Sequence, residues 1–346
     1  MTDPLVVART PLRLSLGGGG TDLPFYSGRF GGDVLSMAIS LHVTVIARGG
    51  RLDARHRYSY ERVSAADSPT DLDEPYVREA LVLTGFSTPC EITSMGPVPS
   101  GTGLGSSGAF AVSLLSALHG LAGRTPSRLH LIEQACELEL GRLRRSVGKH
   151  DQYICGLGGL RRLVIDPSGA VRVDDPAVAR STVDALTARL VLLYTGVRRD
   201  STTSLIPPTS AAGFEERIEQ LHRIRKTGDQ TRAALETGDM DWVAELMREH
   251  WAIKRGNAAP SRWDEIYDLA VANGARAGKL VGAGGGGFLL LFVDPEHREA
   301  VVTAAAAHGV REVRFDYCPT GTTVTRIGDP ATTDDIDDTY SPELLP

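Results

Sequence analysis

The stretch Pro97-Val-Pro-Ser-Gly-Thr-Gly-Leu-Gly-Ser-Ser-Gly108 decides the fold of this 346-residue chain. The alternating segment from Cys90 to Met95 predicts a strand before it, and the small apolar residues from Ala109 to Leu121 predict a helix after it. Glycines let a backbone turn so tightly that its amide groups face an anion, and a helix N-terminus adds about half a positive charge. Strand, glycine-rich loop and helix in this order predict a phosphate-binding loop.

Two common nucleotide-binding motifs do not fit this loop. It has no lysine after the second glycine, which a P-loop requires, and its GxGxG spacing differs from the GxGxxG of dinucleotide-binding proteins. A loop whose glycines serve only its turns is the alternative interpretation. The paired serine hydroxyls at the helix start favour nucleotide binding, because they can reach a phosphate or a metal. We therefore expect nucleotide to be bound by Pro99, Gly101, Gly103, Leu104, Gly105, Ser106, Ser107 and Gly108.

A second glycine run follows the first predicted strand, which extends from Val6 to Leu16. Alternation places the leucines at positions 12, 14 and 16 on one face of this strand and Arg13 on the other. Strand arginines usually face solvent, so Arg13 alone would be assigned no role. Gly17 to Gly20 then lead into Thr21-Asp22-Leu23-Pro24, where Asp22 can bind a ligand or cap a turn.

A carboxylate stands on the apolar face of a further predicted helix, at residues 127–143. Leu129, Ile132, Cys136 and Glu139 follow one another at spacings of three and four, which places them on one face. An ionised side chain there requires a partner, because burying it alone is costly. Magnesium, which favours one or two carboxylates together with phosphate oxygens, is one candidate, and a buried arginine is the other.

Strands and helices follow one another in irregular order, which favours an α+β fold over a doubly wound sheet. The chain length favours two domains, and the turn at Asp166–Gly169 suggests the boundary. We expect domains at 1–168 and 169–327, and an acidic tail at 328–346. In the second half, strands are predicted at 191–194 and 288–293, and helices at 214–236 and 263–273.

The charge distribution disfavours nucleic acid as a partner. The formal net charge is −6, and the acid excess lies in the tail, where six acidic residues from Asp329 onward occur with no Lys or Arg. The rest of the chain is balanced, whereas binding to nucleic acid requires a basic face.

The apolar segments and the cysteine spacing argue against a membrane protein, a secreted protein and a protein stabilised by disulfides or zinc. The longest apolar run, Phe288 to Val293, is far shorter than the ~18 residues that span a bilayer, so we expect no membrane association. The start of the chain lacks the layout of a signal peptide, which predicts a cytoplasmic protein. The four cysteines are scattered without CxxC spacing, so neither a disulfide framework nor a zinc site is expected.

Three motifs together resemble those of the GHMP kinases, the family of galactokinase, homoserine kinase and mevalonate kinase. They are the loop at 97–109, Arg13-Leu-Ser-Leu-Gly-Gly-Gly-Gly-Thr-Asp-Leu-Pro24, and the segment from Gly278 to Leu291. The resemblance implies the GHMP kinase fold, with an N-terminal domain similar to domain 2 of ribosomal protein S5 and a ferredoxin-like C-terminal domain. Within the family, the tetraglycine string and Gly148-Lys-His-Asp-Gln-Tyr153 are most similar to D-glycero-D-manno-heptose 7-phosphate kinases.

The resemblance implies roles for individual residues. Asp151 matches the general base that receives or orients the sugar proton, Arg13 lies where the family holds an arginine near the transferring phosphate, and Lys149 is expected to assist. A local ion pair between Asp151 and Lys149 is the alternative. The family's metal ligands match Glu139 and Ser107. The expected substrate-binding residues are Gly18, Gly19, Gly20, Thr21, Asp22, Gly284 and Gly285.

Several features bear on which sugar is used. Galactokinase has bulkier residues where this chain has glycines, so the loop is open to a larger substrate. His150 departs from the Gly-Lys-Gln-Asp-Gln common in heptose kinases, and we expect it at the surface or behind the site. In the last glycine run, residues 284–287 either approach the substrate or only pack against the Arg13–Pro24 motif. A substrate phosphate requires cations, for which the candidates are Arg198, Arg199, Lys254 and Arg255.

The resemblance thus implies an ATP- and Mg²⁺-dependent sugar kinase acting at the anomeric hydroxyl of D-glycero-D-manno-heptose 7-phosphate. The product would be the 1,7-bisphosphate used to make nucleotide-activated heptose. The expected partners are the sugar phosphate and ATP, with no nucleic acid or membrane, and the chain is expected to be a monomer or homodimer. A hexose 1-kinase acting on fucose or galactose is an alternative, and a non-catalytic sugar and nucleotide sensor on the same fold is another.

Overall fold

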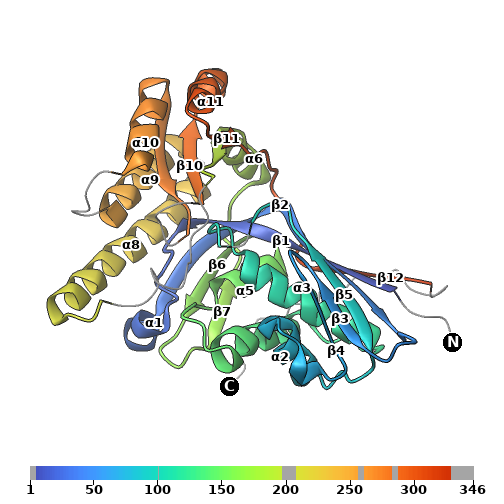
Figure 1. The fold of residues 1–346 in the computed structure, drawn as a ribbon. Helices are drawn as coiled ribbons and strands as arrows, with labels where there is room; N and C mark the ends of the chain where they lie inside the picture. The colour runs from blue at the N-terminus through green and yellow to red at the C-terminus, as the bar shows by residue number, and fades with distance from the viewer. Residues whose placement is uncertain (1–4, 100, 197–207, 256–260, 283–286, 329–346) are drawn as a thin grey trace.

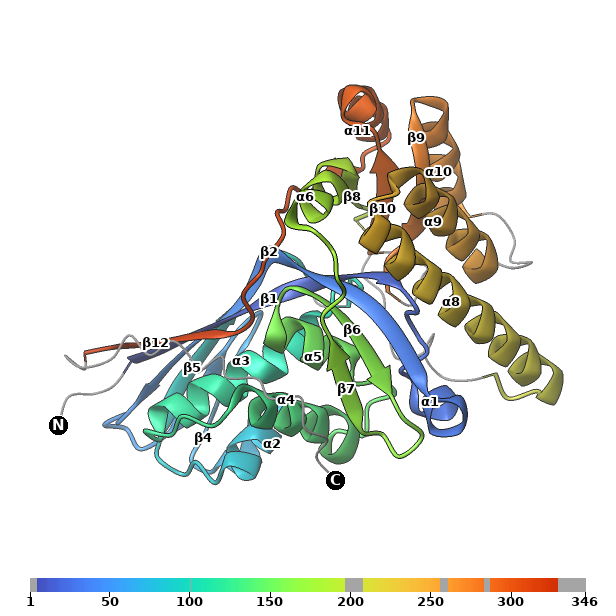
Figure 2. The same ribbon diagram turned by 180° about the vertical axis from the view of Figure 1, so that it is seen from behind.

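The computed structural model describes residues 5–99, 101–196, 208–255, 261–282 and 287–328. Over these residues the strands form an eight-stranded and a four-stranded sheet, and helices pack against both (Figures 1 and 2). The mixture of strands and helices in irregular order confirms the expected α+β class.

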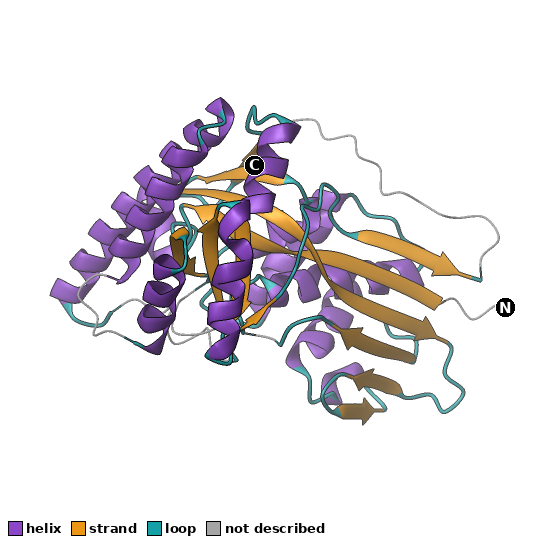
Figure 3. Cartoon of the chain, turned by 90° about the horizontal axis from the view of Figure 1, so that it is seen from above, coloured by secondary structure: helices purple, strands orange, loops and turns teal. Residues whose placement is uncertain are grey.

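The larger sheet is built on two long antiparallel strands, β1 (Leu5–Gly17) and β2 (Gly32–Gly49). Its strand order is β12-β1-β2-β5-β3-β4, and β6 and β7 continue from β2. In the view from above, the long strands reach out from among the helices toward the marked N-terminus (Figure 3). The other strands of this sheet are β3 (His56–Ser59), β4 (Val63–Ala66), β5 (Cys90–Met95), β6 (Leu160–Ile165), β7 (Val171–Asp174) and β12 (Thr323–Ile327).

The smaller sheet has the order β11-β8-β10-β9 and antiparallel pairing. Strand β10, one of its two inner strands, is apolar throughout and fully buried, as expected for a strand covered on both faces. Its strands are β8 (Leu190–Tyr194), β9 (Ala275–Leu280), β10 (Phe288–Val293) and β11 (Arg311–Glu312).

The helices near the first sheet are α1 (Pro24–Phe30), α2 (Pro75–Thr84), α3 (Ser106–Leu121), α4 (Arg128–Cys136) and α5 (His150–Leu157). Those of the second half are α6 (Arg180–Arg189), α8 (Ala211–Thr237), α9 (Met240–Arg255), α10 (Arg262–Ala272) and α11 (Arg298–Ala307). Short helical turns lie at η1 (Pro69–Asp71), η2 (Glu137–Arg142) and η3 (Pro295–His297). None of the described helices is long and apolar enough to cross a bilayer.

Helix α3 is apolar nearly all round because it is covered on all sides. It packs on β1 and β2, with α2, α4 and α5 beside it (Figures 1 and 2). Its position brings its N-terminus, and the glycine loop before it, beside β1 at Arg13, whose N–H donates to the Leu104 carbonyl at 3.1 Å.

An irregularity in the pairing of β1 with β2 lies where Arg13 turns toward the helices. The hydroxyl of Thr10 accepts a hydrogen bond from Ser113 of α3, and Arg13 bonds to Asp151 of α5, although residues three apart in a regular strand face opposite sides. The register with β2 shifts between Pro11 and Leu12, and such an irregularity exchanges the two faces of a strand. Proline has no N–H to donate and therefore fits a bulge.

The expected division of the chain at residue 168 does not coincide with the change of sheet. The turn at Asp166–Gly169 joins β6 to β7, which pair with each other in the larger sheet. Strand β12 also belongs to that sheet, since it pairs antiparallel with β1 in the register Leu5 to Ile327. The chain therefore leaves the larger sheet after β7 and returns to it with β12.

Candidate active site

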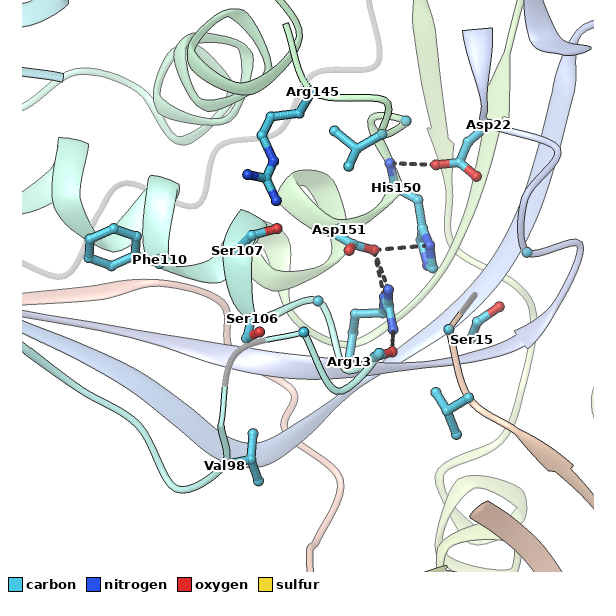
Figure 4. A pocket seen from close by; sticks show the side chains of 18 of the residues that line it. Arg13, Ser15, Asp22, Val98, Ser106, Ser107, Phe110, Arg145, His150 and Asp151 are labelled. Atoms are coloured by element: carbon cyan, nitrogen blue, oxygen red, sulfur yellow. Dashed lines mark hydrogen bonds and ion pairs between the residues drawn. The ribbon is translucent and has the colours of Figure 1, made fainter. Parts of the chain in front are cut away.

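A cavity of about 470 Å³ is lined by residues from both sheets and from helices α3, α5, α8 and α9. It extends from an aromatic end beside β5, past the glycine loop, to the second glycine run after β1. The predicted residues Arg13, Asp22 and Asp151 all line it (Figure 4).

The glycine loop presents its backbone to this cavity. Gly101, Gly103 and Gly105 have φ angles of 76°, 90° and 76°, which only glycine adopts without strain. Gly105 is the residue before α3, so Ser106 and Ser107 form the first turn of that helix at its positive end. These five residues line the cavity. The geometry is that of an anion-binding loop.

The other three residues predicted to bind nucleotide have supporting positions. Pro99 accepts a hydrogen bond from Thr102 through its carbonyl at 2.9 Å, and Leu104 is fully buried in the core. A Cβ on Gly108 would lie 2.8 Å from the Cβ of Asp151, so this glycine allows α3 and α5 to approach closely. Their contribution is to the shape of the loop and the position of Asp151.

Asp151 and Arg13 form an ion pair in the wall of the cavity. Nε and Nη2 of Arg13 donate to Oδ1 of Asp151 at 2.7 and 2.5 Å, and Nη1 donates to the Gly103 carbonyl at 2.6 Å. Burial raises the pKa of Asp151, but the charge of Arg13, the neighbouring His150 and the hydrogen bonds from Arg13 together outweigh this and hold the pKa below its usual value. Asp151 is therefore ionised, and Arg13, only 5% exposed, joins it to the glycine loop.

Lys149 does not occupy the catalytic position expected for it. Its ammonium group donates to both carboxylate oxygens of Glu133 at 3.1 and 3.0 Å, and it is not among the residues that line the cavity. The start of α5 directs this side chain toward α4, so the alternative, an ion pair between Lys149 and Asp151, does not form either.

His150 lies beside Asp151 rather than at the surface. It is 4% exposed, and its Nδ1 lies 3.3 Å from Oδ1 of Asp151. Burial, together with the charge of Arg13, lowers the pKa of His150 to about 3, so the ring is neutral at physiological pH. A neutral ring with its proton on Nδ1 can donate to the Asp151 carboxylate.

Asp22 is a second carboxylate in the cavity. Its Oδ2 accepts the backbone N–H of His150 at 3.3 Å, and it does not cap α1, which begins after Leu23 without a side-chain cap. Burial, followed by the charge of Asp151, raises the pKa of Asp22 to about 6. The turn-capping alternative is therefore wrong.

The residues of the tetraglycine segment have two roles: some line the cavity and others hold the loop in place. Gly19 and Gly20 line the cavity. Gly18, with φ of 73°, packs so closely on the Asp33 carbonyl that a side chain would collide with it, and the buried hydroxyl of Thr21 donates to the carbonyls of Gly18 and Asp33. Gly18 and Thr21 thus fix the loop against Asp33, while Gly19 and Gly20 face the space beside Asp22.

The third motif packs against the glycine loop. Gly284 and Gly285 lie outside the described residues, but the flanking Gly282 and Gly287 are described. A Cβ on Gly282 would lie 2.5 Å from Cα of Gly103, and one on Gly287 would collide with the Thr102 carbonyl. The close packing is thus against the loop at 97–109, whereas packing against the Arg13–Pro24 motif was the alternative considered.

Glu139 and Ser107 are suited to hold a magnesium ion. Glu139 is fully buried (0% exposed) in η2, a π-helical turn, and accepts hydrogen bonds from Tyr76 at 2.8 Å and Gln152 at 2.5 Å. Burial raises its pKa, an effect that the hydrogen bonds from Tyr76 and Ser107 oppose. Within the described ranges no cation pairs with it, so the buried-arginine alternative is wrong.

The donor set also agrees with magnesium chemistry. One carboxylate and one hydroxyl are hard oxygen ligands, and Mg²⁺ completes its coordination with phosphate oxygens and water. In the part of the chain that the structure describes, no three acidic, His or Cys side chains are grouped to hold a metal by themselves. Ser107 lines the cavity and Glu139 lies behind it, so they would hold the ion against a phosphate.

Two functional features carried no local sequence signal. The far end of the cavity is lined by apolar and aromatic side chains, and the ring of Phe110 contacts those of Tyr58 and Tyr76, with centroids 6.2 and 5.7 Å apart. Such a surface suits a flat base. Arg145 lies over Tyr76 at 5.8 Å from the ring and near Ser107 (Figure 4). These residues come from separate elements, so no spacing along the chain reveals them.

Comparison with known proteins agrees with this site. Residues 75–159 match the GHMP kinases N-terminal domain, and residues 231–311 match the GHMP kinases C-terminal domain. The chain is 30% identical over 310 residues to D-glycero-alpha-D-manno-heptose 7-phosphate kinase of Campylobacter jejuni, covering 86% of this chain and 91% of that protein. The chain belongs to the GHMP kinase family, and it is a phosphotransferase of the sugar kinase type.

Two further relatives extend the comparison. The crystal structure of a D-glycero-D-manno-heptose 1-phosphate kinase from Bacteroides thetaiotaomicron superposes with a TM-score of 0.77 and 26% identity, covering 94% of this chain and all (100%) of that one. The bifunctional fucokinase/GDP-fucose pyrophosphorylase of Arabidopsis thaliana is 26% identical over 88% of this chain, which spans 31% of that protein. Kinases of this family use ATP.

Proposed function

We propose that this chain transfers the γ-phosphoryl group of ATP to the anomeric hydroxyl of D-glycero-D-manno-heptose 7-phosphate, giving the 1,7-bisphosphate and ADP. The observation that carries the proposal is the contact of Arg13 with both the Asp151 carboxylate and the Gly103 carbonyl. This contact fixes a carboxylate beside a loop built for phosphate. A hydroxyl placed between them would have an acceptor for its proton and an electrophile in reach.

The reaction balances with Asp151 as the proton acceptor. The hydroxyl oxygen forms a bond to the γ-phosphorus while the bond from this phosphorus to the bridging oxygen breaks, and ADP leaves with that electron pair. The hydroxyl proton passes to Asp151. A carboxylate with a lowered pKa is a weak base, but phosphoryl transfer has a loose transition state that needs little early deprotonation. Asp151 therefore orients the hydroxyl first and receives the proton late.

Cationic and amide groups around the loop neutralise the phosphates. The amides at the start of α3 and the guanidinium of Arg13 face the region where charge develops on the transferred group. Arg145, which lines the cavity near Ser107, is placed to contact the triphosphate. Magnesium, when held by Ser107 and Glu139, supplies further positive charge to the phosphates.

The sugar end of the cavity supports a heptose. Asp22 can accept hydrogen bonds from two hydroxyls, and Gly19 and Gly20 leave the wall beside it without side chains. The Campylobacter relative is named for heptose 7-phosphate, and the Bacteroides relative for heptose 1-phosphate. His150 stands where heptose kinases commonly have glutamine, and either residue can donate to Asp151.

The proposal is tested by measuring ADP release against a panel of sugars and sugar phosphates, with phosphorus NMR of the product. We expect turnover with D-glycero-D-manno-heptose 7-phosphate and a new anomeric phosphate signal. Turnover with free fucose or galactose in its place would favour a hexose 1-kinase, to which the similarity to the Arabidopsis fucokinase points. No turnover with any sugar would favour a sensor.

A further inference from the structure

Most of the cations that line the cavity are already bonded within the protein. Arg13 is paired with Asp151. Lys279 donates to the Leu16 carbonyl at 2.8 Å, and Lys254 donates to the carbonyls of Leu280 and Gly282. Among the positions that sequence alone suggested for a substrate phosphate, Arg255 is paired with Asp264 at 3.0 Å, and Arg198 and Arg199 lie outside the described residues.

Arg217, on α8, also lines the cavity but has no anionic partner among the described residues. Its Nη1 donates to the neutral amide oxygen of Gln220 at 3.3 Å, and no described carboxylate lies within ion-pair distance. The side chain is half-buried, and burial lowers its pKa. A cation that loses part of its hydration without gaining an anion is costly, so its position calls for a charged ligand.

The guanidinium of Arg217 lies over the open part of the tetraglycine run. A Cβ on Gly20 would lie 3.9 Å from its Nη2 and 3.3 Å from Leu221. Gly19 and Gly20 line the cavity together with Asp22, so glycines separate Arg217 from the carboxylate proposed to bind sugar hydroxyls. A substrate held by Asp22 could extend past these glycines to the guanidinium.

The region proposed for the triphosphate lies elsewhere, around Ser106, Ser107 and Arg145, next to the first turn of α3. Arg217 belongs to α8 and contacts the opposite side of the cavity, at the second glycine run. Figure 4 shows Arg13 and Asp151 between Ser107 and Asp22, so the glycine loop and the sugar end of the cavity lie on either side of the proposed base. The arrangement fits a sugar that carries one phosphate already and receives another at its far end.

On the basis of the proposed function, we propose that Arg217 binds the phosphate of the sugar substrate and makes the enzyme prefer a phosphorylated sugar. The planar guanidinium can donate two parallel hydrogen bonds to a phosphate, and the glycines at 19 and 20 provide the passage to it. This role is one of binding and specificity, since Arg217 need not touch the reacting hydroxyl.

The test compares kcat/KM for D-glycero-D-manno-heptose 7-phosphate and for the unphosphorylated heptose in the wild type and Arg217→Gln. We expect the variant to lose on the order of 10- to 100-fold with the phosphorylated sugar, mainly through a higher KM, and less than about 3-fold with the unphosphorylated one. Arg217→Lys should retain part of the preference, because it keeps the charge. Arg223→Gln, an exposed arginine of the same helix outside the cavity lining, is the matched control and should change neither value.

The outcomes separate this inference from the proposed function. Equal losses with both sugars, or no loss with either, would show that Arg217 is structural or absent from the site and would overturn the inference. A wild type that uses sugars but shows no preference for the phosphorylated one would contradict the substrate assignment itself, whatever the variants do.

Discussion

Asp22 and Asp151 show how two carboxylates in one cavity acquire different properties. Both are buried, but of the two carboxylates only Asp151 accepts hydrogen bonds from Arg13, which together with the neighbouring His150 keeps its pKa below the usual value. Burial, followed by the charge of Asp151, raises the pKa of Asp22 to about 6. Asp151 is thus ionised throughout the physiological range, whereas Asp22 gains a proton in mildly acidic solution. This difference predicts that replacing Asp151 changes the rate of catalysis, whereas replacing Asp22 changes stability and sugar binding.

Asp151→Asn should lower kcat on the order of 10²- to 10⁴-fold, because the amide cannot receive the hydroxyl proton. ATP affinity, measured by calorimetry, should stay within a few-fold of the wild type, since the glycine loop is unchanged. His150→Gln is the control at the neighbouring position, and because glutamine can also donate to Asp151 it should keep most of the activity. A rate like that of the wild type in Asp151→Asn would remove Asp151 from the mechanism.

Asp22→Asn should stabilise the ligand-free protein while weakening sugar binding. The folded-state pKa of about 6 exceeds the ordinary 3.8, so the stabilisation from the protonated form is complete below pH ~4 and is lost as pH rises through 6. Above that pH the buried charge costs about 3 kcal/mol, part of which asparagine removes.

Urea denaturation at pH 8 and pH 4 checks this effect of Asp22→Asn. We expect a gain of about 1–3 kcal/mol at pH 8 and little change at pH 4, together with a higher KM for the sugar at pH 8. A loss of stability at pH 8 would show that the carboxylate is not strained by burial and by Asp151.

At the level of elements, the approach of α3 to α5 positions the proposed base. A Cβ on Gly108 would lie 2.8 Å from Cβ of Asp151 and 2.9 Å from the backbone nitrogen of Gln152. Since backbone cannot move aside as a side chain can, Gly108→Ala should push the two helices apart. We expect kcat to fall on the order of 10- to 100-fold, because small displacements of catalytic groups are costly.

Gly120→Ala, in the same helix, is the matched control. Its Cβ would lie 2.8 Å from Cγ1 of Val6, a side chain that can rotate, and far along α3 from the loop. It should lower stability by about 1–3 kcal/mol and leave kcat unchanged. Steady-state kinetics and thermal unfolding of both variants distinguish the two effects, and equal kcat values would show that α5 does not depend on Gly108.

The elements also show where sequence reasoning stops. The alternation of leucines placed Arg13 on the face opposite to them, but the register shift opposite Pro11 and Leu12, where Arg13 turns toward α5, was not predicted. Pro11 was the available signal, since proline within a strand indicates an edge or a bulge. The helix predicted at 127–143 changes to a π-helical turn at Glu137, because hydrogen bonding there follows tertiary packing rather than local propensity.

Across the whole molecule, Lys279 joins the two sheets through its hydrogen bond to Leu16. Burial, followed by the charges of Lys254 and Arg13, lowers the pKa of Lys279 from 10.5 to about 7. The unfolded chain therefore holds this proton up to a higher pH than the folded protein does, so stability should rise between pH 7 and 10.

Lys279→Met should remove this pH dependence. The wild type should gain about 2 kcal/mol relative to the variant between pH 7 and pH 9, as measured by urea denaturation without ligands. The comparison cancels the titration of other groups, which both proteins share. Parallel stability curves would show that the ammonium group is not desolvated.

The site as a whole was only partly predictable. Arg13 and Asp151 belong to recognisable sequence motifs, and the structure brings them together. Lys149 belongs to the same motif, but its side chain points to Glu133, which no sequence spacing reveals. Arg217 and Arg145 reach the cavity from outside the three motifs, so only the packing of the elements shows their proximity.

The pairing of β12 with β1 has a consequence for synthesis. Because Ile327 lies opposite Leu5, the strand that carries Arg13 keeps one open edge until almost the entire described chain has left the ribosome. The larger sheet thus cannot be completed before the strands of the smaller sheet have been made, and the strand that carries Arg13 is sealed by a segment that follows them in the chain. The same adjacency would allow Ile327 and Leu5 to be connected by a short turn and the chain reopened elsewhere, as in a circular permutant.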